Sequence, residues 1–359
     1  MTSELFTCQN GEQIPYYQKN VRDFLHRTTA LFGPSETGKT TIIREILFLL
    51  KDVIPILVVI APSDQSNEAY SSVVPPQCIH DDFNIDVIKK VYERQKIACK
   101  VYNDVNRLEL LMSLFKMVPN KDKEIKLIHI INSKFTRYVS VLKNNASKEN
   151  RGDFKRKVEK AKDSRNESIR IVLKNSIRIY RHYLAKLDLT KPQQYALKYL
   201  DFNPEVLLIL DDCADEFKKH NNDPIIRMLF YKARHFKITF IISFQDDKDL
   251  DSSLRKGSHI KIFTNSNVAG TYFRRPANGF TPEQRKKLDK YVNSVYTEDD
   301  HNYEKLMYIR ASKEPYQVLL ADEYEFKFGS DKMWQMASRA PPPEESLNKD
   351  NPFYDSFQI

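Results

Sequence analysis

The stretch "LFGPSETGKTT" at residues 31–41 constrains the fold of this chain more than any other feature of the sequence. Gly33 and Gly38 are separated by four residues and are followed by Lys39 and Thr40, which matches the pattern G-x-x-x-x-G-K-[ST] in full. A loop with this spacing turns its backbone N–H groups inward around phosphates, and the helix that follows points its positive end at them. The pattern therefore requires a strand before the loop and a helix after it.

Both neighbours of the loop are predicted by the sequence. "TTALF" is a short apolar run with β-branched threonines, and "KTTIIREILFLL" repeats its apolar residues at helical spacing. Lys39 is expected to reach the β- and γ-phosphates of ATP, and the Thr40 hydroxyl to ligate Mg²⁺. The carboxylate of Glu36 is expected to face solvent or, alternatively, a neighbouring subunit, because the cradle consists of backbone donors. The predicted nucleotide-binding residues are Gly33, Pro34, Ser35, Glu36, Thr37, Gly38, Lys39, Thr40 and Thr41.

Continuous apolar runs predict further strands. "PILVVIAP", "EVLLILDDC" and "KITFIISFQDD" are typical of strands buried on both faces of a parallel sheet. "SHIKIF" and the hairpin "KLMYIRASKEPYQVLLAD" add more strands, and residues 86–118 repeat apolar side chains at helical intervals with Asp86 as the expected N-cap. The alternation of strands and helices predicts an α/β fold, in which a mostly parallel sheet carries helices on both faces.

Two carboxylates end one of these buried strands. Asp211 is expected to face the phosphate loop from an adjacent strand and to hold Mg²⁺ through water next to Thr40. Asp212 follows directly, where a general base could polarise the attacking water. The structural alternative is that one of the two caps a helix. If Asp212 does not act as the base, Asp215 or Glu216 is the next candidate.

The positive charge of the chain is concentrated in one segment. Residues 121–191 hold 20 Lys and Arg against 8 Asp and Glu, an excess of +12, whereas the remainder holds 37 against 40. Residues 119–200 are predicted to form a basic helical hairpin inserted into the α/β domain, which grips the phosphates of double-stranded DNA. The alternative is an exposed face that contacts other subunits, or a capsid or portal protein. The densest cluster consists of Lys155, Arg156, Lys157, Lys160, Lys162 and Arg165.

Several classes of protein are excluded by composition. No apolar run approaches the roughly 20 residues of a membrane helix, because Lys51 and Asp52 interrupt the best candidate. The first residues are polar and acidic rather than basic and then apolar, so no secretory signal, no membrane partner and an intracellular location are expected. The four cysteines contain no C-x-x-C pair, which argues against a zinc site or a disulfide framework.

The order of these motifs resembles the FtsK/HerA superfamily and, within it, the poxvirus-type genome-packaging ATPases of large DNA viruses. The resemblance rests on "GPSETGKTT", "VVIAPSDQSNEAYSSVVPPQCIH", "LLILDDC", "ARHFKITFIISFQ" and "SSLRKGSHIKIF", and covers roughly residues 25–275. It implies a P-loop NTPase fold of the ASCE or RecA-like type, ATP and Mg²⁺ as cofactors, and a ring of identical subunits that moves DNA. Many cellular members carry Asp-Glu where this chain has Asp211 and Asp212.

The resemblance also implies roles for single residues. The polar residue at the end of the strand after Asp211 would sense the γ-phosphate, which favours Gln245, with Ser243 second. In such rings an arginine enters the neighbouring subunit's site, where it is worth about 10³–10⁵ in rate. Arg255 and Arg234 are the leading candidates, although a surface or ion-pair role is at least as good an interpretation of either. Arg274 and Arg275 are weaker candidates for the same role. His235 is interpreted as a core residue.

The predicted function is ATP-driven packaging of double-stranded viral DNA. A nucleotide or nucleoside kinase and a helicase-like DNA-dependent ATPase remain as alternatives, whereas a GTP-binding switch lacks the N-K-x-D motif. The predicted organisation is an N-terminal extension at 1–26, the ATPase domain at 27–118 and 201–335, the basic insertion at 119–200 and a flexible Pro-rich tail at 336–359.

Overall fold

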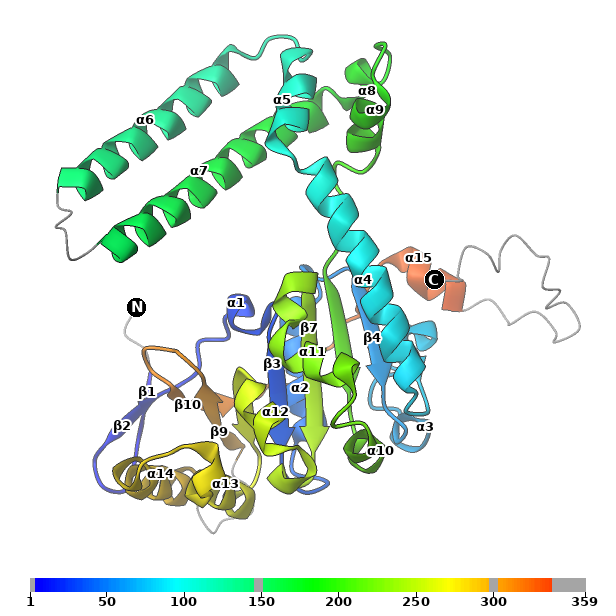
Figure 1. The fold of residues 1–359 in the computed structure, drawn as a ribbon. Coiled ribbons are helices and arrows are strands. Elements are labelled where there is room, and N and C mark those ends of the chain that lie inside the picture. The colour runs from blue at the N-terminus through cyan, green and yellow to red at the C-terminus, as the bar shows by residue number, and fades with distance from the viewer. Residues whose placement is uncertain (1–3, 145–150, 297–302, 338–359) are drawn as a thin grey trace, which may run out of the picture. The chain divides into compact units, whose positions relative to one another are not determined.

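The computed structural model describes residues 4–144, 151–296 and 303–337. These form two compact units, unit 1 with residues 1–97 and 204–359 and unit 2 with residues 98–203. Figure 1 shows the elements of both units. The predicted α/β fold is confirmed, because unit 1 is built on a mostly parallel sheet with helices on both faces.

The described residues of unit 1 form an eight-stranded sheet in the order β10-β9-β8-β3-β7-β6-β4-β5. The six strands from β8 to β5 are parallel, and β9 and β10 add an antiparallel hairpin next to β8. The strands of this sheet are β3 (Thr28–Phe32), β4 (Ile56–Ile60), β5 (Ile79–His80), β6 (Val206–Leu210), β7 (Ile238–Phe244), β8 (Ile260–Phe263), β9 (Glu304–Ile309) and β10 (Tyr316–Leu320).

Two apolar cores cover the two faces of the sheet, because successive side chains of a strand point to opposite faces. Phe32, Leu208 and Phe240 face one core and Leu31, Leu207 and Ile241 the other. The first core contains residues of α4 (Ile85–Val105), α10 (Ala214–Lys219), α11 (Pro224–Tyr231), α12 (Ser252–Gly257), α13 (Ser266–Arg274) and α14 (Pro282–Val295). The second contains residues of α1 (Val21–Phe24) and α2 (Lys39–Leu50).

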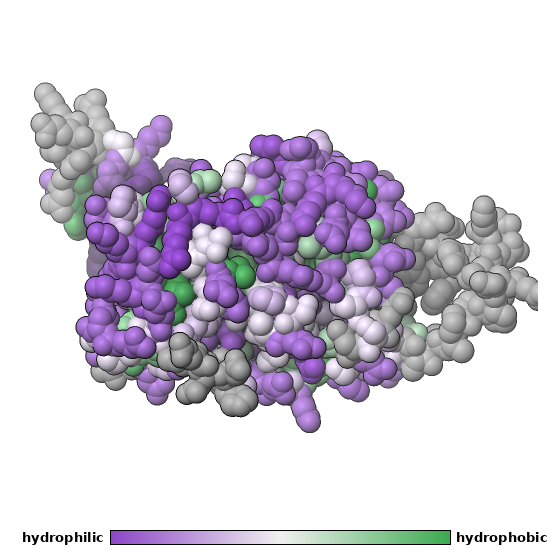
Figure 2. Space-filling view, turned by 90° about the horizontal axis from the view of Figure 1, so that it is seen from below, coloured by the Kyte–Doolittle hydropathy of each residue, from purple (hydrophilic) through white to green (hydrophobic). Residues whose placement is uncertain are grey.

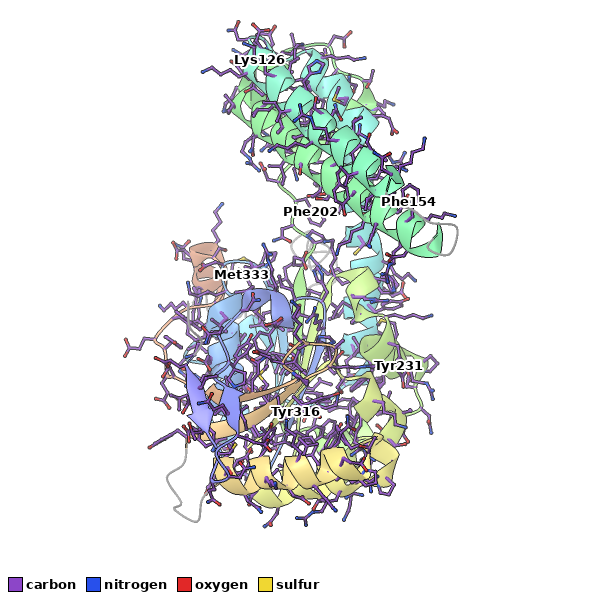
Figure 3. All side chains as sticks on the ribbon, turned by 90° about the vertical axis from the view of Figure 1, so that its left-hand side faces the viewer. Lys126, Phe154, Phe202, Tyr231, Tyr316 and Met333 are labelled. Carbon is purple, nitrogen blue, oxygen red and sulfur yellow. The ribbon has the colours of Figure 1, made fainter. Side chains whose placement is uncertain are left out.

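Short elements complete unit 1. The predicted N-terminal extension contains an antiparallel pair of strands that the sequence analysis missed, and Tyr16 bridges to Val318 of β10. Aromatic rings pack where β9 and β10 meet the helices, with Tyr316 against Phe273, Tyr291 and Tyr308 (Figure 3). The remaining elements are β1 (Leu5–Thr7), β2 (Gln13–Pro15), α3 (Asp64–Asn67), α15 (Asp331–Ala337) and the 3-10 turns η1 (Pro76–Cys78), η3 (Ala233–Phe236), η4 (Asp247–Asp249) and η5 (Pro276–Asn278).

Unit 2 is helical, and an antiparallel helical hairpin is its main feature. Figure 3 labels Lys126 near the start of one hairpin helix, α6, and Phe154 near the start of the other, α7. The unit begins at 98, earlier than the predicted insertion at 119, since Leu111, Leu114 and Phe115 share a core with α7. Its helices are α5 (Leu108–Lys116), α6 (Asp122–Asn144), α7 (Arg151–Ile179), α8 (Arg181–Leu184) and α9 (Lys191–Lys198).

Three local predictions need comment. Helix α4 begins one residue before Asp86, and the Asn84 side chain accepts the Asp86 N–H at 2.8 Å, so the prediction of Asp86 as the N-cap is wrong. The predicted tail from 336 overlaps the end of α15, and its residues 338–359 lie outside the described part of the chain. Among the described residues, no helix has both the length and the apolar character to cross a membrane.

One face of the molecule is mostly polar. On the face of the molecule in Figure 2, hydrophilic residues cover most of the area, and hydrophobic residues appear only as small separate patches. All four cysteines carry free thiols, with Cys8, Cys99 and Cys213 buried and Cys78 partly buried.

Candidate functional site

The phosphate loop lies at the carboxyl end of β3 and leads into α2. Gly38 precedes the helix with a φ of 88°, a left-handed conformation that favours glycine, and Lys39 is the first helical residue. Glu36 also has a positive φ, of 64°, and its side chain is exposed. Pro34 and Ser35 are exposed as well, whereas Thr37, Thr40 and Thr41 are partly buried.

Close packing holds the first glycine of the loop. A Cβ atom at Gly33 would lie 1.9 Å from the Thr264 hydroxyl, so only glycine fits there. Thr264 directly follows β8, and its N–H donates to the Phe32 carbonyl at 2.9 Å. Its hydroxyl is 2.5 Å from that of Thr37. Thr264 therefore links the loop to the neighbouring strand, a contact that the sequence analysis missed.

Lys39 folds over its own loop. Its ammonium donates to the carbonyls of Gly33 at 2.7 Å and Pro34 at 2.6 Å. Burial lowers the pKa of Lys39, and the carboxylates of Asp211 and Asp212 oppose this shift. An ammonium held by weak backbone acceptors beside two carboxylates is available to a stronger acceptor such as a phosphate.

Asp211 faces the loop, but its strand is not the neighbour of β3. Strand β7 lies between β3 and β6, so the expectation of an adjacent strand is wrong. Asp211 still reaches the loop, because the carboxyl ends of parallel strands meet at one edge of a sheet, and the Thr40 hydroxyl lies 3.4 Å from Asp211 Oδ2. Asp211 is only 5% exposed.

Two further hydroxyl groups surround the Asp211 carboxylate. Tyr70 donates to Oδ2 at 2.6 Å, and Ser243 donates to Oδ1. Ser243 also accepts the Asp212 N–H at 3.3 Å. Ser243 was the second candidate for the residue that senses the γ-phosphate. Its side chain is buried and bonded to Asp211, so it is not free for that role. The sequence contained Tyr70 within a motif of the resemblance, but no signal marked it as a site residue.

The geometry fits a magnesium ion held mainly by phosphates. The described residues contain no group of three or more His, Cys, Asp or Glu that could hold a metal ion by itself. Thr40 and Asp211 supply a hydroxyl and a carboxylate oxygen, ligand types that Mg²⁺ accepts alongside water and substrate phosphates. The hydroxyl donors around Asp211 leave its charge uncancelled, which suits a cation.

The predicted base and sensor are both exposed. Asp212 has a φ of 56°, a strained conformation for a residue other than glycine, and such strain is concentrated at functional sites. Gln245 directly follows β7, and the Gly33 N–H donates to the carbonyl of the residue before it, Phe244, at 3.1 Å. Gln245 therefore lies beside the start of the phosphate loop. Asp215 and Glu216 are exposed in α10, and Asp215 pairs with Lys218.

The candidate arginines differ in accessibility. Arg255 is 6% exposed and lies 3.4 Å from Asp247, which also binds Arg275 at 2.9 Å. Arg255 therefore has the ion-pair role that the sequence left open, because a buried guanidinium cannot reach a neighbouring subunit. Arg274 is exposed and pairs with Asp289.

Arg234 is exposed in η3, which precedes the amino end of β7. It is thus at the edge of the sheet opposite its own phosphate loop. His235 is exposed too, so its interpretation as a core residue is wrong.

The basic cluster on α7 is spread around the helix. Arg156 and Lys157 pair with Asp153, and Lys162 pairs with Glu159. Lys155 and Lys160 are exposed, and within the described residues they make no ion pair. They are the members of the cluster with side chains free for a polyanion.

Arg165 is the exception in this cluster. It donates to Asn132 of α6 at 2.7 Å and lies over the Phe135 ring. Residues four or seven apart lie on the same face of a helix. Arg165 is seven residues from Val158 and four from Ala161 and Ile169, so it lies on the apolar face of α7. Arg165 therefore joins the two helices of the hairpin instead of facing a ligand, contrary to the prediction.

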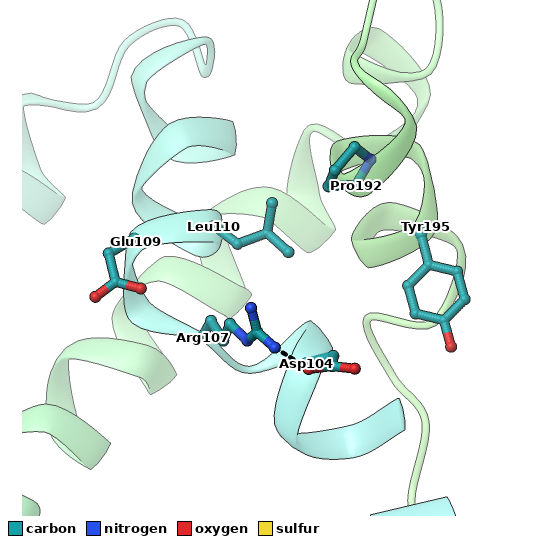
Figure 4. A pocket seen from close by; sticks show the side chains of 6 residues that line it. All are labelled: Asp104, Arg107, Glu109, Leu110, Pro192 and Tyr195. Carbon is teal, nitrogen blue, oxygen red and sulfur yellow. Dashed lines mark hydrogen bonds and ion pairs between the residues drawn. The ribbon is translucent and has the colours of Figure 1, made fainter. Parts of the chain in front are cut away.

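Unit 2 also contains a surface cavity, which Figure 4 shows. Its volume is about 410 Å³, and it is lined by Asp104, Arg107, Glu109, Leu110, Pro192 and Tyr195. Asp104 and Arg107 form an ion pair with each other. The cavity shares no residue with the phosphate loop, and its paired charges give it no evident ligand.

Comparison with known proteins finds viral relatives. The chain is 28% identical over 374 residues to the uncharacterized protein B354L of African swine fever virus (isolate Tick/Malawi/Lil 20-1/1983), a match that covers 98% of this chain and 99% of that protein. It is 43% identical over 68 residues to the uncharacterized protein 075L of Invertebrate iridescent virus 6, which covers 19% of this chain and 26% of that protein. No family model matches the chain.

Comparison with solved structures also finds matches. The genome packaging NTPase B204 from Sulfolobus turreted icosahedral virus 2, in complex with AMP, is 12% identical, with coverage of 83% of this chain and 98% of that chain and a TM-score of 0.38. The plasmid coupling protein TrwB is 13% identical, with 91% of each chain covered and a TM-score of 0.37.

Proposed function

We propose that this chain is a magnesium-dependent ATPase that translocates double-stranded DNA during the packaging of a viral genome. The observation that carries the proposal is the approach of Asp211 to Thr40 at the phosphate loop, with 3.4 Å between carboxylate and hydroxyl oxygens. The motifs of the sequence and the viral relatives that match the chain over its length support the packaging role.

The backbone and the side chains of the loop have different roles in binding the nucleotide. The backbone N–H groups between Gly33 and Thr40 cradle the phosphates, and the Lys39 ammonium exchanges the carbonyls of its own loop for phosphate oxygens. Thr40 and Asp211 would hold Mg²⁺, which would supply positive charge to neutralise the phosphates.

Hydrolysis needs a positioned water molecule. Asp212 and Gln245 follow neighbouring strands, β6 and β7, and both side chains are exposed at the edge that carries the loop. Asp212 polarises the water as a general base and Gln245 senses the γ-phosphate. Arg234, at the other edge of the sheet, acts on the site of a neighbouring subunit in a ring. Because Arg255 is buried, it supports the loop after Gln245 through Asp247 and has no part in this step.

The helical hairpin supplies the grip on DNA. A motor that moves along any sequence needs contacts to phosphates, which Lys and Arg provide without reading bases. Lys155 and Lys160 make these contacts, because their side chains are exposed and form no ion pair within the described residues.

Hydrolysis of ATP with and without long duplex DNA tests the proposal. We expect duplex DNA to stimulate hydrolysis several-fold and D211A to abolish the stimulated rate. Transfer of phosphate to a nucleoside, with no response to DNA, would support the kinase alternative instead. Stimulated hydrolysis that survives D211A would refute the assignment of the metal site.

The DNA contact is tested separately by charge reversal. The double variant K155E/K160E should weaken duplex binding and reduce the slope of log affinity against log salt by about 2, since each lost phosphate contact removes about 0.9. Its matched control is K286E/K290E, which reverses the charge of two exposed lysines of α14. Equal effects of the two variants would show that general charge, and not the hairpin, governs binding.

A further inference from the structure

The Asp211 carboxylate is held by two neutral donors. Tyr70 Oη donates to Oδ2 at 2.6 Å, and Ser243 Oγ donates to Oδ1, so each carboxylate oxygen has a buried hydroxyl partner in addition to the Thr40 hydroxyl, which lies 3.4 Å from Oδ2. All three side chains are buried, with Tyr70 1%, Ser243 2% and Asp211 5% exposed. A buried carboxylate in this position would ordinarily be paired with a cation, but these partners orient it and leave its charge intact.

Tyr70 is itself fixed by its backbone. Its N–H donates to the Asp64 carboxylate at 2.6 Å, and its carbonyl accepts from Val73 at 2.9 Å and Val74 at 2.8 Å. Asp64 is buried as well and begins α3, the short helix after β4. The ring therefore extends from the segment after α3 to the end of β6, the strand next to β4.

The phenol donates to the carboxylate oxygen that faces Thr40. Its hydrogen bond of 2.6 Å ends on Oδ2, and the Thr40 hydroxyl lies 3.4 Å from the same oxygen. An oxygen of a carboxylate has two lone-pair sites, so Oδ2 can accept from Tyr70 and face Thr40 at the same time.

We infer that Tyr70, together with Ser243, is a positioning residue that holds the Asp211 carboxylate toward Thr40 and so sets the affinity of the site for the magnesium–nucleotide complex. The inference rests on the proposed function, because it assigns Asp211 to the metal. A hydroxyl donor suits this task, since a Lys or Arg in its place would cancel the charge that the metal needs.

A purely structural role for Tyr70 makes a different prediction. Buried tyrosine hydroxyls usually find some acceptor, and Tyr17 in the same core does so by donating to the Asn20 carbonyl at 2.9 Å. If the hydrogen bond from Tyr70 to Asp211 only satisfied the buried hydroxyl, its loss would lower the free energy of unfolding and would not change the affinity for Mg²⁺. Tyr17→Phe is therefore the matched control, because it removes a buried hydroxyl of this core away from Asp211.

Binding of a fluorescent non-hydrolysable ATP analogue to the full chain distinguishes these roles. Affinity is measured first in EDTA and then as Mg²⁺ is titrated. For Tyr70→Phe we expect affinity in EDTA within twofold of wild type and a half-saturating Mg²⁺ concentration raised about tenfold, as expected for the loss of a hydrogen bond to a charged group. Tyr17→Phe should match wild type in both titrations.

The outcomes are separable. A Tyr70→Phe protein that folds and has the wild-type Mg²⁺ midpoint would overturn the inference, as would an equal loss of affinity with and without Mg²⁺. If Tyr70→Phe does not fold, Ser243→Ala removes the partner of the other carboxylate oxygen and must raise the Mg²⁺ midpoint for the inference to stand. Failure of the wild-type protein to bind the analogue, or binding indifferent to Mg²⁺, would instead refute the proposed function.

Discussion

Replacement of Gly33 by alanine should damage the phosphate loop through one identified clash. The added Cβ would lie 1.9 Å from Thr264 Oγ1, 3.0 Å from Thr37 Oγ1 and 3.2 Å from Thr264 Cβ. An ordinary contact begins at 3.4 Å, so the hydroxyl and the loop must separate by roughly 1.5 Å. Thr264 cannot move freely, because it is 4% exposed and its N–H is bound to the Phe32 carbonyl.

The cost follows from this geometry. Overpacking of this kind destabilises by about 1–3 kcal/mol, and G33A belongs at the upper end because its neighbours belong to the sheet and the loop. T264A alone should cost about 1 kcal/mol, through the lost bond to Thr37. The double variant G33A/T264A removes the 1.9 Å contact and leaves those of 3.0 Å to Thr37 Oγ1 and 3.2 Å to the Cβ atom of residue 264. It should therefore be more stable than the sum of the single effects predicts, by at least about 1 kcal/mol.

Urea denaturation measured by the fluorescence of Trp334, the single tryptophan, reports on unit 1. Titration with the ATP analogue measures the nucleotide affinity. For G33A this affinity should fall at least tenfold, because the added methyl group displaces the loop. Gly38→Ala is the comparison, since it meets no atom within 4 Å and is strained only through its φ of 88°. Wild-type stability of G33A, or strict additivity in the double variant, would refute the reasoning.

Three further predictions concern residues outside the loop. Arg255→Met leaves the buried Asp247 with Arg275 as its one remaining ion-pair partner, so it should lower the free energy of unfolding by about 3 kcal/mol in urea denaturation. If the variant instead has wild-type stability but has lost the stimulation of hydrolysis by DNA, Arg255 would act on a neighbouring subunit's site. Burial lowers the pKa of Lys261 to about 7, so the unfolded chain binds more protons than the folded chain between pH 7 and 10. Wild type should therefore gain up to about 5 kcal/mol relative to Lys261→Met as pH rises through that window, and parallel pH profiles would contradict this. Arg165→Ala removes the contacts of Arg165 with Asn132 and Phe135, so it should speed amide hydrogen exchange in α6. It should change DNA affinity less than K155E/K160E does. Unchanged exchange would argue that Arg165 does not join the two helices.

The core of the site was predictable because its signals are local. The phosphate loop is one contiguous pattern, and the strand that ends in Asp211 is a continuous apolar run, so both could be located without knowledge of their neighbours. The order of strands was not predictable in the same way. Nothing in the apolar runs of β6 and β7 says that β7 lies next to β3, because pairing in a parallel sheet depends on contacts between distant segments.

Some of the missed features had a signal in the sequence. Thr281 is the N-cap of α14 and forms a capping box with Gln284, and Pro282 is the first helical residue. Arg165 could have been separated from the DNA cluster by its helical spacing from Val158 and Ala161. In both cases the local pattern was sufficient.

Other features had no such signal. Tyr70 and Thr264 are single residues brought to the site from the segments that follow α3 and β8, and tyrosine and threonine at those positions look like ordinary loop residues. The burial of Arg255 depends on Asp247, eight residues away, and on Arg275 beyond β8. Such contacts are properties of the folded unit, so they follow from the structure alone.

A crystal or cryo-EM structure of the protein with Mg²⁺ and a non-hydrolysable ATP analogue tests the nucleotide site most directly. We expect the triphosphate to lie within the backbone of residues 33–40, the Thr40 hydroxyl to ligate the metal, and Asp211 to contact the metal through water while still bonded to Tyr70. A nucleotide bound elsewhere, or a metal with Asp211 turned away from it, would refute the assignment of the nucleotide site.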